Sequence, residues 1–187
     1  MKRIKEFFEK PSVAMAIRPI LVFSILCICL GLFLHSYKPV LIIDDNMAEM
    51  LKINDLIFVS KQAYASRDIR FGDVVLHDSG IPDGSGGYYQ YCNRVIGLPG
   101  DKIRIKDAIV NRNGVELDEP YVTRAQEYSE MDQFIVPDGC YFMLSDNRAI
   151  SIDSRYERIG FITKDQIRGR VVFRILPISR TGNISLQ

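Results

Sequence analysis

The stretch from Tyr91 to Asp101, YCNRVIGLPGD, decides the structural class of the chain. Its first half interleaves polar and apolar side chains, and its second half contains a proline and two glycines. Alternation with a period of two predicts a half-buried strand, and Leu-Pro-Gly-Asp predicts a tight turn. We therefore expect a strand over residues 88–96 that turns directly into a second strand.

Short apolar runs between turn signals continue on both sides of this stretch. Further strands are expected over 56–59, 73–77, 102–106, 108–111, 115–117, 140–144 and 171–175. The other expectations are a flexible loop over 79–87, irregular chain over 118–134 and a short helix within 163–168. Many short strands with frequent turns indicate a mostly β domain, built as a barrel or a folded sheet.

An apolar segment near the N-terminus predicts a transmembrane helix. Residues 19–34, PILVFSILCICLGLFL, carry no charge, and extension back to Ser12 gives 23 residues, enough to cross about 30 Å of hydrocarbon. Five basic and two acidic residues occur among the first 18, and only Lys38 follows closely. The positive-inside bias therefore predicts residues 1–16 in the cytoplasm, 17–36 in the membrane and 37–187 outside. A cleavable signal peptide stays open as an alternative, although no A-x-A-like site follows the apolar run.

Composition excludes some functions. A net charge of +1 gives no general case for nucleic-acid binding. The four cysteines form no CxxC motif or Cys/His cluster, so neither a metal nor another cofactor is expected. A Cys92–Cys140 disulfide stays open for an exported domain, because the sequence does not place the two sulfurs.

Three segments resemble the signature boxes of type I signal peptidases, the serine/lysine proteases that remove signal peptides at the membrane surface. They are RFGDVV at 70–75, YCNRVIGLPGD at 91–101 and SDNRAISIDSR at 145–155. Two more matches are DEPY at 118–121 and IRGRVVFR at 167–174. The resemblance implies that family's mostly antiparallel β domain, with a smaller β subdomain over about 103–140, behind one membrane anchor.

The resemblance also implies where the family's catalytic dyad would stand, and both positions are asparagine here. The family's serine segment corresponds to IDDNMAEML at 43–51, in which Met47 helps to fix the register and Asn46 takes the nucleophile position. The family's general base is the lysine before the arginine of the second box, where Asn93 precedes Arg94. A carboxamide is neither a nucleophile nor a base near neutral pH, because its nitrogen lone pair is delocalised.

A third departure lies two residues before Asn46. There the family's serine helps to form the oxyanion hole, whereas this chain has Asp44, whose carboxylate would repel a developing oxyanion. Asp44 and Asp45 are expected as neighbours on an extended strand, in a solvated acidic edge. The two asparagines are expected to hydrogen-bond to each other across the former site. His35 and His77 receive no catalytic role.

Other positions match the family. By resemblance, Ser151 is the serine that contacts the lysine, and Asp153 and Arg155 form an ion pair beneath the site. The positions expected to keep the scaffold of the site are Met47, Arg94, Asp146, Asn147, Arg148, Ser151, Asp153 and Arg155.

Active family members bind an extended peptide as an added strand, and the fold can keep this groove without the dyad. The resemblance therefore predicts a non-catalytic binding or assembly factor for exported proteins. Similar degenerate proteins occur in pilus gene clusters of Gram-positive bacteria, so the expected partners are membrane lipid, extended peptide segments, pilin and sortase. Two alternatives stay open: an active signal peptidase with an atypical site, and a regulatory decoy that pairs with an active one.

Overall fold

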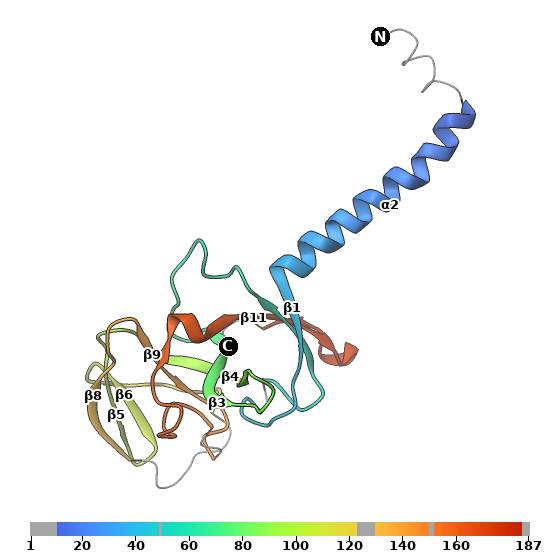
Figure 1. Cartoon of the computed structure of the whole chain (residues 1–187). Helices are drawn as coiled ribbons and strands as arrows, with labels where there is room; N and C mark the ends of the chain where they lie inside the picture. The colour runs from blue at the N-terminus through green and yellow to red at the C-terminus, as the bar shows by residue number, and fades with distance from the viewer. Residues whose placement is uncertain (1–10, 49, 123–129, 150–151, 185–187) are drawn as a thin grey trace. The chain divides into compact units, whose positions relative to one another are not determined.

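The computed structural model describes residues 11–48, 50–122, 130–149 and 152–184, with the backbone alone for 11–14 and 16. The chain divides between Tyr37 and Lys38 into two compact units. The first unit contains one helix, and the second contains nearly all of the strand residues (Figure 1). The predicted mostly β chain with one apolar N-terminal helix is confirmed.

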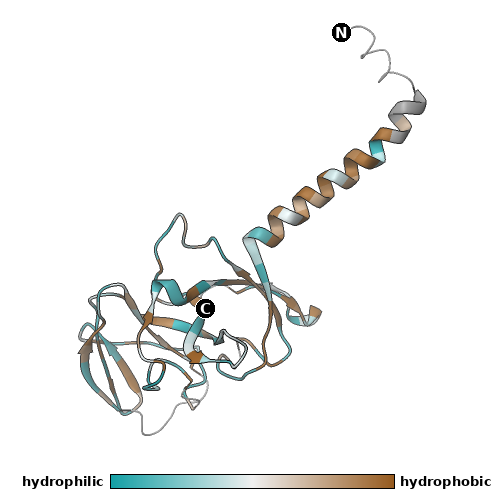
Figure 2. Ribbon diagram, in the orientation of Figure 1, coloured by the Kyte–Doolittle hydropathy of each residue, from teal (hydrophilic) through white to brown (hydrophobic). Residues whose placement is uncertain are grey.

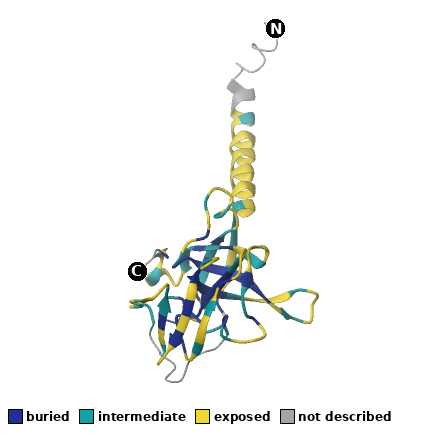
Figure 3. Ribbon diagram, turned by 90° about the vertical axis from the view of Figure 1, so that its left-hand side faces the viewer, coloured by how far each residue is buried: buried dark blue, intermediate teal, exposed yellow. Residues whose placement is uncertain are grey.

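Helix α2 spans Pro11–Ser36. Its segment Ile17–Ser36 is 20 residues long, and no residue in the most apolar part of this segment is buried within the protein. Figures 2 and 3 show the same segment as largely apolar and almost wholly exposed. So many exposed apolar side chains are unfavourable in water and favourable in hydrocarbon. Length and composition therefore make α2 a candidate membrane span, although a signal sequence would have the same features.

The larger sheet has eight strands in the order β1-β2-β11-β3-β4-β9-β10, with β12 paired to β11. The strands are β1 Tyr37–Leu41, β2 Leu56–Ser60, β3 Val74–Pro82, β4 Tyr88–Gly97, β9 Cys140–Leu144, β10 Ile162–Thr163, β11 Ile167–Leu176 and β12 Gly182–Asn183. Every neighbouring pair from β2 to β10 is antiparallel. The first sequence box, 70–75, leads into β3, the second, 91–101, begins within β4, and the third, 145–155, follows β9. Because β3, β4 and β9 are adjacent, the sheet brings the three boxes together.

A second sheet has four strands in the order β7-β6-β5-β8. The strands are β5 Lys102–Lys106, β6 Ile109–Arg112, β7 Val115–Glu116 and β8 Met131–Ile135. In β5 the side chains alternate between exposed and buried, as its sequence KIRIK predicts. The buried side chains pack against Ile96, Phe142 and Leu144 of the larger sheet, so the two sheets share an apolar core.

Two glycines allow strands to approach closely. A Cβ on Gly97 would lie 2.8 Å from Cγ2 of Val136 and 3.0 Å from Cβ of Phe142. Gly169 has a φ of +152°, and a Cβ there would lie 2.3 Å from the carbonyl oxygen of Ser60 on β2. A larger residue at either position would therefore push neighbouring strands apart.

Some predicted boundaries are wrong. The loop expected over 79–87 is shorter, because β3 continues to Pro82 along β4. The chain expected to be irregular over 118–134 contains the beginning of β8, which pairs with β5; residues 123–129 lie outside the described ranges. The helix expected within 163–168 is a single 3-10 turn, Lys164–Gln166.

The disulfide alternative is also wrong. Cys92 and Cys140 are free thiols. Cys92 belongs to a cluster with Met47 and Leu76, whereas Cys140 packs against the cluster shared by the two sheets. Each cysteine therefore serves as a small apolar residue in a different part of the core.

Candidate functional site

The segment around Asn46 lies against the third sequence box. The backbone N–H of Asn147 donates to the carbonyl oxygen of Asn46 at 2.9 Å, and Nδ2 of Asn147 donates to the carbonyl oxygen of Asp45 at 3.1 Å. Met47 is buried in a core cluster with Leu76 and Cys92, which also anchors the segment. The chain turns over residues 44–48, so the expected extended strand is wrong there.

Asn93 lies on β4, completely buried and fully hydrogen-bonded. Its Oδ1 is 2.7 Å from Nε2 of His77, and its Nδ2 donates to Oγ of Ser145 at 3.0 Å and to the carbonyl oxygen of Ile152 at 3.4 Å. Three separate segments therefore hold both ends of the carboxamide. At this position the side chain is part of the structural core, as buried polar groups with full hydrogen bonding usually are.

His77 on β3 is a site residue that the sequence analysis missed. Oxygen atoms face both of its ring nitrogens: Oδ1 of Asn93, and the carbonyl oxygen of Asp78 at 3.1 Å from Nδ1. Two oxygens favour the charged imidazolium, but complete burial disfavours any charge. Burial is the larger influence, so the pKa of His77 lies below its ordinary value. At neutral pH the ring is therefore a neutral partner of Asn93.

A sequence signal for His77 did exist. In the β3–β4 pairing His77 lies opposite Tyr91, two residues before Asn93. Side chains two apart on a strand share a face, so His77 and Asn93 project from the same side of the hairpin. Pairing the first two boxes as a hairpin in this register would have placed the histidine beside Asn93.

The side chain of Asn46 contrasts with that of Asn93. Its Oδ1 and Nδ2 are both buried, and neither has a hydrogen-bond partner among the described residues; the same holds for Oδ1 of Asn147. The predicted hydrogen bond between Asn46 and Asn93 is therefore wrong, because Asn93 is bonded to other groups. Each buried polar group without a partner costs about 1–3 kcal/mol.

Asp44 accepts a hydrogen bond from the backbone N–H of Asn46, the residue predicted at the nucleophile position. The acceptor atom is Oδ1, and the bond is 3.1 Å long. A backbone N–H at the nucleophile is the kind of donor that stabilises the oxyanion in serine proteases. Burial, and to a smaller extent repulsion from Asp45, raise the pKa of Asp44, while the Asn46 N–H opposes the rise. Asp44 is half-buried on the cavity wall, so the expected solvated acidic edge is only partly solvated at this residue.

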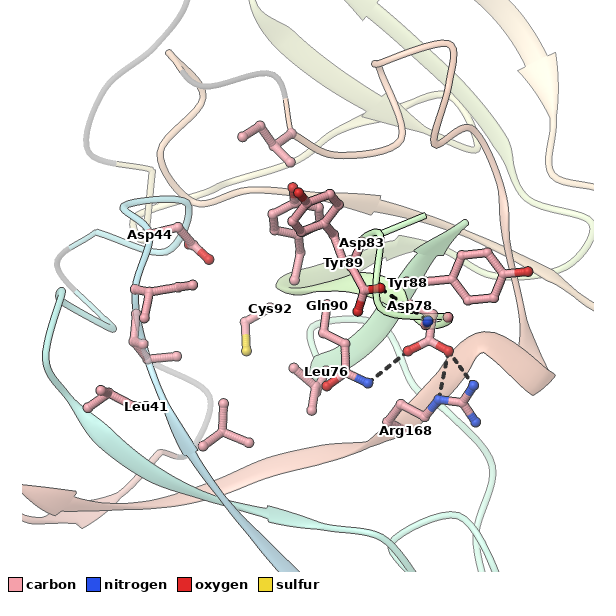
Figure 4. A pocket seen from close by; sticks show the side chains of 17 residues that line it. Leu41, Asp44, Leu76, Asp78, Asp83, Tyr88, Tyr89, Gln90, Cys92 and Arg168 are labelled. Carbon is pink, nitrogen blue, oxygen red and sulfur yellow. Dashed lines mark hydrogen bonds and ion pairs between the residues drawn. The ribbon is translucent and has the colours of Figure 1, made fainter. Parts of the chain in front are cut away.

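Asp44 also lines a cavity of about 1020 Å³ (Figure 4). One wall is the segment Val40–Asp44. The other walls come from β3 and β4, which provide Leu76 and Cys92, and from Arg168 of β11. The size and largely apolar walls suit a segment of extended peptide.

Buried ion pairs support the region around these residues. Arg94 makes two hydrogen bonds to Asp146, at 2.8 and 2.6 Å, and both side chains are 1% exposed. The expected ion pair of Asp153 and Arg155 is present at 2.7 Å. Ser151, the remaining predicted scaffold residue, lies outside the described ranges.

The DEPY segment completes this scaffold. Glu119 accepts hydrogen bonds from both terminal nitrogens of Arg148, at 3.1 and 2.5 Å. The guanidinium of Arg94 lies 4.0 Å from the ring centroid of Tyr121. Segments about 30 and 50 residues apart in the sequence therefore meet in one charged cluster.

A family model described as "Signal peptidase, peptidase S26" matches residues 15–176, which is most of the chain. The chain belongs to this signal peptidase family. A signal peptidase I of Bacillus caldolyticus is 32% identical over 172 residues, an alignment that covers 84% of this chain and 90% of that protein. A probable signal peptidase I-2 of Synechocystis is 34% identical over 139 residues and covers 74% of this chain. The alignment spans 62% of the Synechocystis protein.

Among solved structures, a signal peptidase I of Enterococcus faecalis is 28% identical and superposes with a TM-score of 0.44. That comparison covers 56% of this chain and 97% of the other. Membership of the signal peptidase family rests on the family model and on the sequence relatives. In this member, the positions that correspond by resemblance to the nucleophile and the base are Asn46 and Asn93.

Proposed function

We propose that this member of the signal peptidase family holds exported proteins at the membrane without cleaving them. The observation that carries the proposal is the state of the two dyad positions. Asn93 is fully engaged with His77, Ser145 and Ile152, and the backbone N–H of Asn46 is engaged by Asp44. Attack on a peptide carbonyl needs a nucleophile, a base and a free oxyanion donor, and each of these positions is unsuitable.

Cys92 does not replace the missing serine. Its thiol lines the cavity, but burial, with Asp44 contributing, raises its pKa to about 12. A thiol is nucleophilic as the thiolate, which is scarce so far below the pKa. The cavity therefore suits binding better than covalent chemistry.

The placement in the cell is part of the same proposal. Residues 1–16 lie in the cytoplasm, 17–36 cross the membrane and 37–187 lie outside, with 103–140 as a smaller β subdomain. The apolar segment Ile17–Ser36 and the basic residues before it support this orientation. The substrates are then extended segments of exported proteins, such as pilins in sortase-dependent pilus assembly.

The first experiment measures cleavage. The purified full-length chain is incubated with a preprotein, and a Bacillus signal peptidase I is run in parallel. We expect no product from this chain. Cleavage that the substitution Asn46→Ala abolishes would overturn the proposal in favour of an active peptidase with an atypical site.

A graded restoration tests the chemical reason. Asn46→Ser with Asn93→Lys supplies a hydroxyl and an amine but leaves Asp44 at the oxyanion donor, so we expect little cleavage. Adding Asp44→Ser should raise the rate by at least about 10-fold, because the donor becomes free. Equal rates for the double and triple variants would show that Asp44 does not obstruct the site.

The partner is tested by crosslinking in cells. If the chain assists pilus assembly, pilin and sortase should crosslink to the domain, and deletion of the chain should reduce polymerised pilin. Recovery of an active signal peptidase, without pilin or sortase, would favour the decoy alternative.

A further inference from the structure

The cavity beside Asp44 combines apolar walls with a few charges. Its apolar lining includes Val40, Ile42, Leu76 and Cys92. Figure 4 shows the carboxyl group of Asp44 on the N-terminal segment and the thiol of Cys92 on the strand across the cavity. A bound peptide would displace water from these walls. Any charge on the lining would then interact more strongly with charges on the peptide, because the effective dielectric constant falls.

All but one of the charged groups on the lining already have strong partners. Asp78 forms an ion pair with Arg168 and accepts a hydrogen bond from Gln90 at 2.8 Å. Asp83 accepts hydrogen bonds from the backbone N–H groups of Ser85 and Gly87 and from the Ser85 hydroxyl. The charge of Asp78 is therefore balanced by a cation, and the charge of Asp83 is stabilised by three hydrogen bonds.

Asp44 differs from these two carboxylates. It accepts one hydrogen bond, from the backbone N–H of Asn46, and it forms no ion pair within the part of the chain that the structure describes. Lys38, on β1, donates to Oε1 of Gln90 at 2.8 Å instead. The cavity thus has a half-buried carboxylate whose charge no cation of the described chain balances.

We infer that Asp44 selects for a basic residue in the peptide that occupies the cavity, by pairing with a lysine or arginine side chain that projects from an otherwise apolar extended segment. The inference rests on the proposed function and specifies its substrate class. Complementary charge at a desolvated position favours the matched partner and disfavours an acidic one. The position that opposes catalysis thereby becomes the position that determines specificity.

The ionisation of Asp44 fits this role. Burial raises its pKa, which means that the ionised carboxylate is less favourable here than in water. An ammonium or guanidinium beside it would reverse that effect and lower the pKa. Asp44 therefore gains from a cationic partner, whereas Asp78 already has one.

The test compares three peptides that share one apolar sequence and differ at a central position, which is lysine, norleucine or glutamate. Binding to the full-length chain in detergent micelles is measured by fluorescence anisotropy, and mass spectrometry monitors the integrity of each peptide. We expect the lysine peptide to bind about 10-fold more tightly than the norleucine peptide, and the glutamate peptide to bind most weakly.

The variants isolate Asp44. Asp44→Asn keeps an oxygen for the Asn46 N–H and should remove the preference for lysine, while Asp83→Asn, on the same cavity, should keep it. Asp44→Lys should prefer the glutamate peptide, which a merely structural role of Asp44 would not produce. Thermal melting of each variant confirms that the domain is folded.

The outcomes separate this inference from the proposed function. Equal affinity for lysine and norleucine peptides, or a lysine preference that persists in Asp44→Asn, overturns the inference and leaves peptide holding intact. Failure of all three peptides to bind overturns both. Cleaved peptides in the mass spectra overturn the proposed function, whatever the preference.

Discussion

The surroundings of Asn93 and of Asn46 differ, although both asparagines are completely buried and both were predicted, by resemblance, at the family's dyad positions. Asn93 is hydrogen-bonded on every side, whereas the carboxamide of Asn46 has no partner among the described residues and adjoins the half-buried Asp44. Asn93 is thus part of the structural core. The nucleophile side has polar groups that a ligand could still satisfy, and functional sites commonly retain such unfavourable groups.

The largest predicted effect concerns the ion pair next to Asn93. Asp146→Ala would leave Arg94 charged and buried without its partner, so we expect a loss of about 3–5 kcal/mol in the free energy of unfolding. Denaturant titration measures this loss. For comparison, Arg168→Gln removes a guanidinium that is 49% exposed and leaves Asp78, 7% exposed, with its hydrogen bond from Gln90, so it should cost less, about 1–2 kcal/mol. Similar losses for both variants would show that the burial of both partners in the Arg94–Asp146 pair does not determine its contribution to stability.

The second prediction compares the two asparagines directly. Asn93→Leu leaves the Ser145 hydroxyl and the His77 ring without their hydrogen-bond partner, so it should lower the free energy of unfolding by about 2–3 kcal/mol. Asn46→Leu keeps the branching of the side chain and removes two polar atoms without partners, which offsets part of the cost of its larger volume, so it should cost less than Asn93→Leu. Chemical denaturation of both variants gives the comparison. If Asn46→Leu is the more destabilising, the described contrast between the two sites is wrong.

The third prediction is a pH dependence from His77. Its pKa in the folded state is lowered from the ordinary 6.5, so the unfolded chain binds the proton first on acidification. This contribution to stability is fully present above pH 6.5 and is lost as the pH falls from there towards the folded pKa, by up to about 1.4 kcal/mol per pH unit. In the variant His77→Gln, the free energy of unfolding should change less between pH 7 and 5 than it does in the unmodified chain. An unchanged slope would assign the dependence to other groups.

The smallest predicted effect is on the nucleophile side. The pKa of Asp44 is raised in the fold, so its ionised form opposes folding above that pKa. Asp44→Asn should therefore raise the unfolding free energy at pH 7 by about 0.5 kcal/mol, a small value because the carboxylate is still partly solvated. The gain should vanish below the ordinary pKa of 3.8, where both forms of the chain hold a protonated Asp44. Destabilisation at pH 7 would contradict the assignment of an unbalanced charge.

Local patterns in the sequence predicted most of the strands correctly. The alternation in KIRIK and YCNRVI and the glycine-containing turns specify strands without reference to distant residues, since side chains on a strand alternate with a period of two. The exceptions are informative. Strand β8 and the second half of β3 are strands because partners elsewhere in the chain hydrogen-bond to them, and local propensity does not include those partners.

By itself the sequence determined the apolar helix, the mostly β class and, through the matched boxes, the presence of asparagine at positions 46 and 93. The tertiary structure alone decided that His77 and Ser145 hold Asn93, that Asn46 lacks a partner and that Asp44 occupies the backbone donor beside it. The physical reason is that residue identity fixes which bonds a side chain can make. Only strand register and burial fix which groups come within reach and how strongly water competes for them.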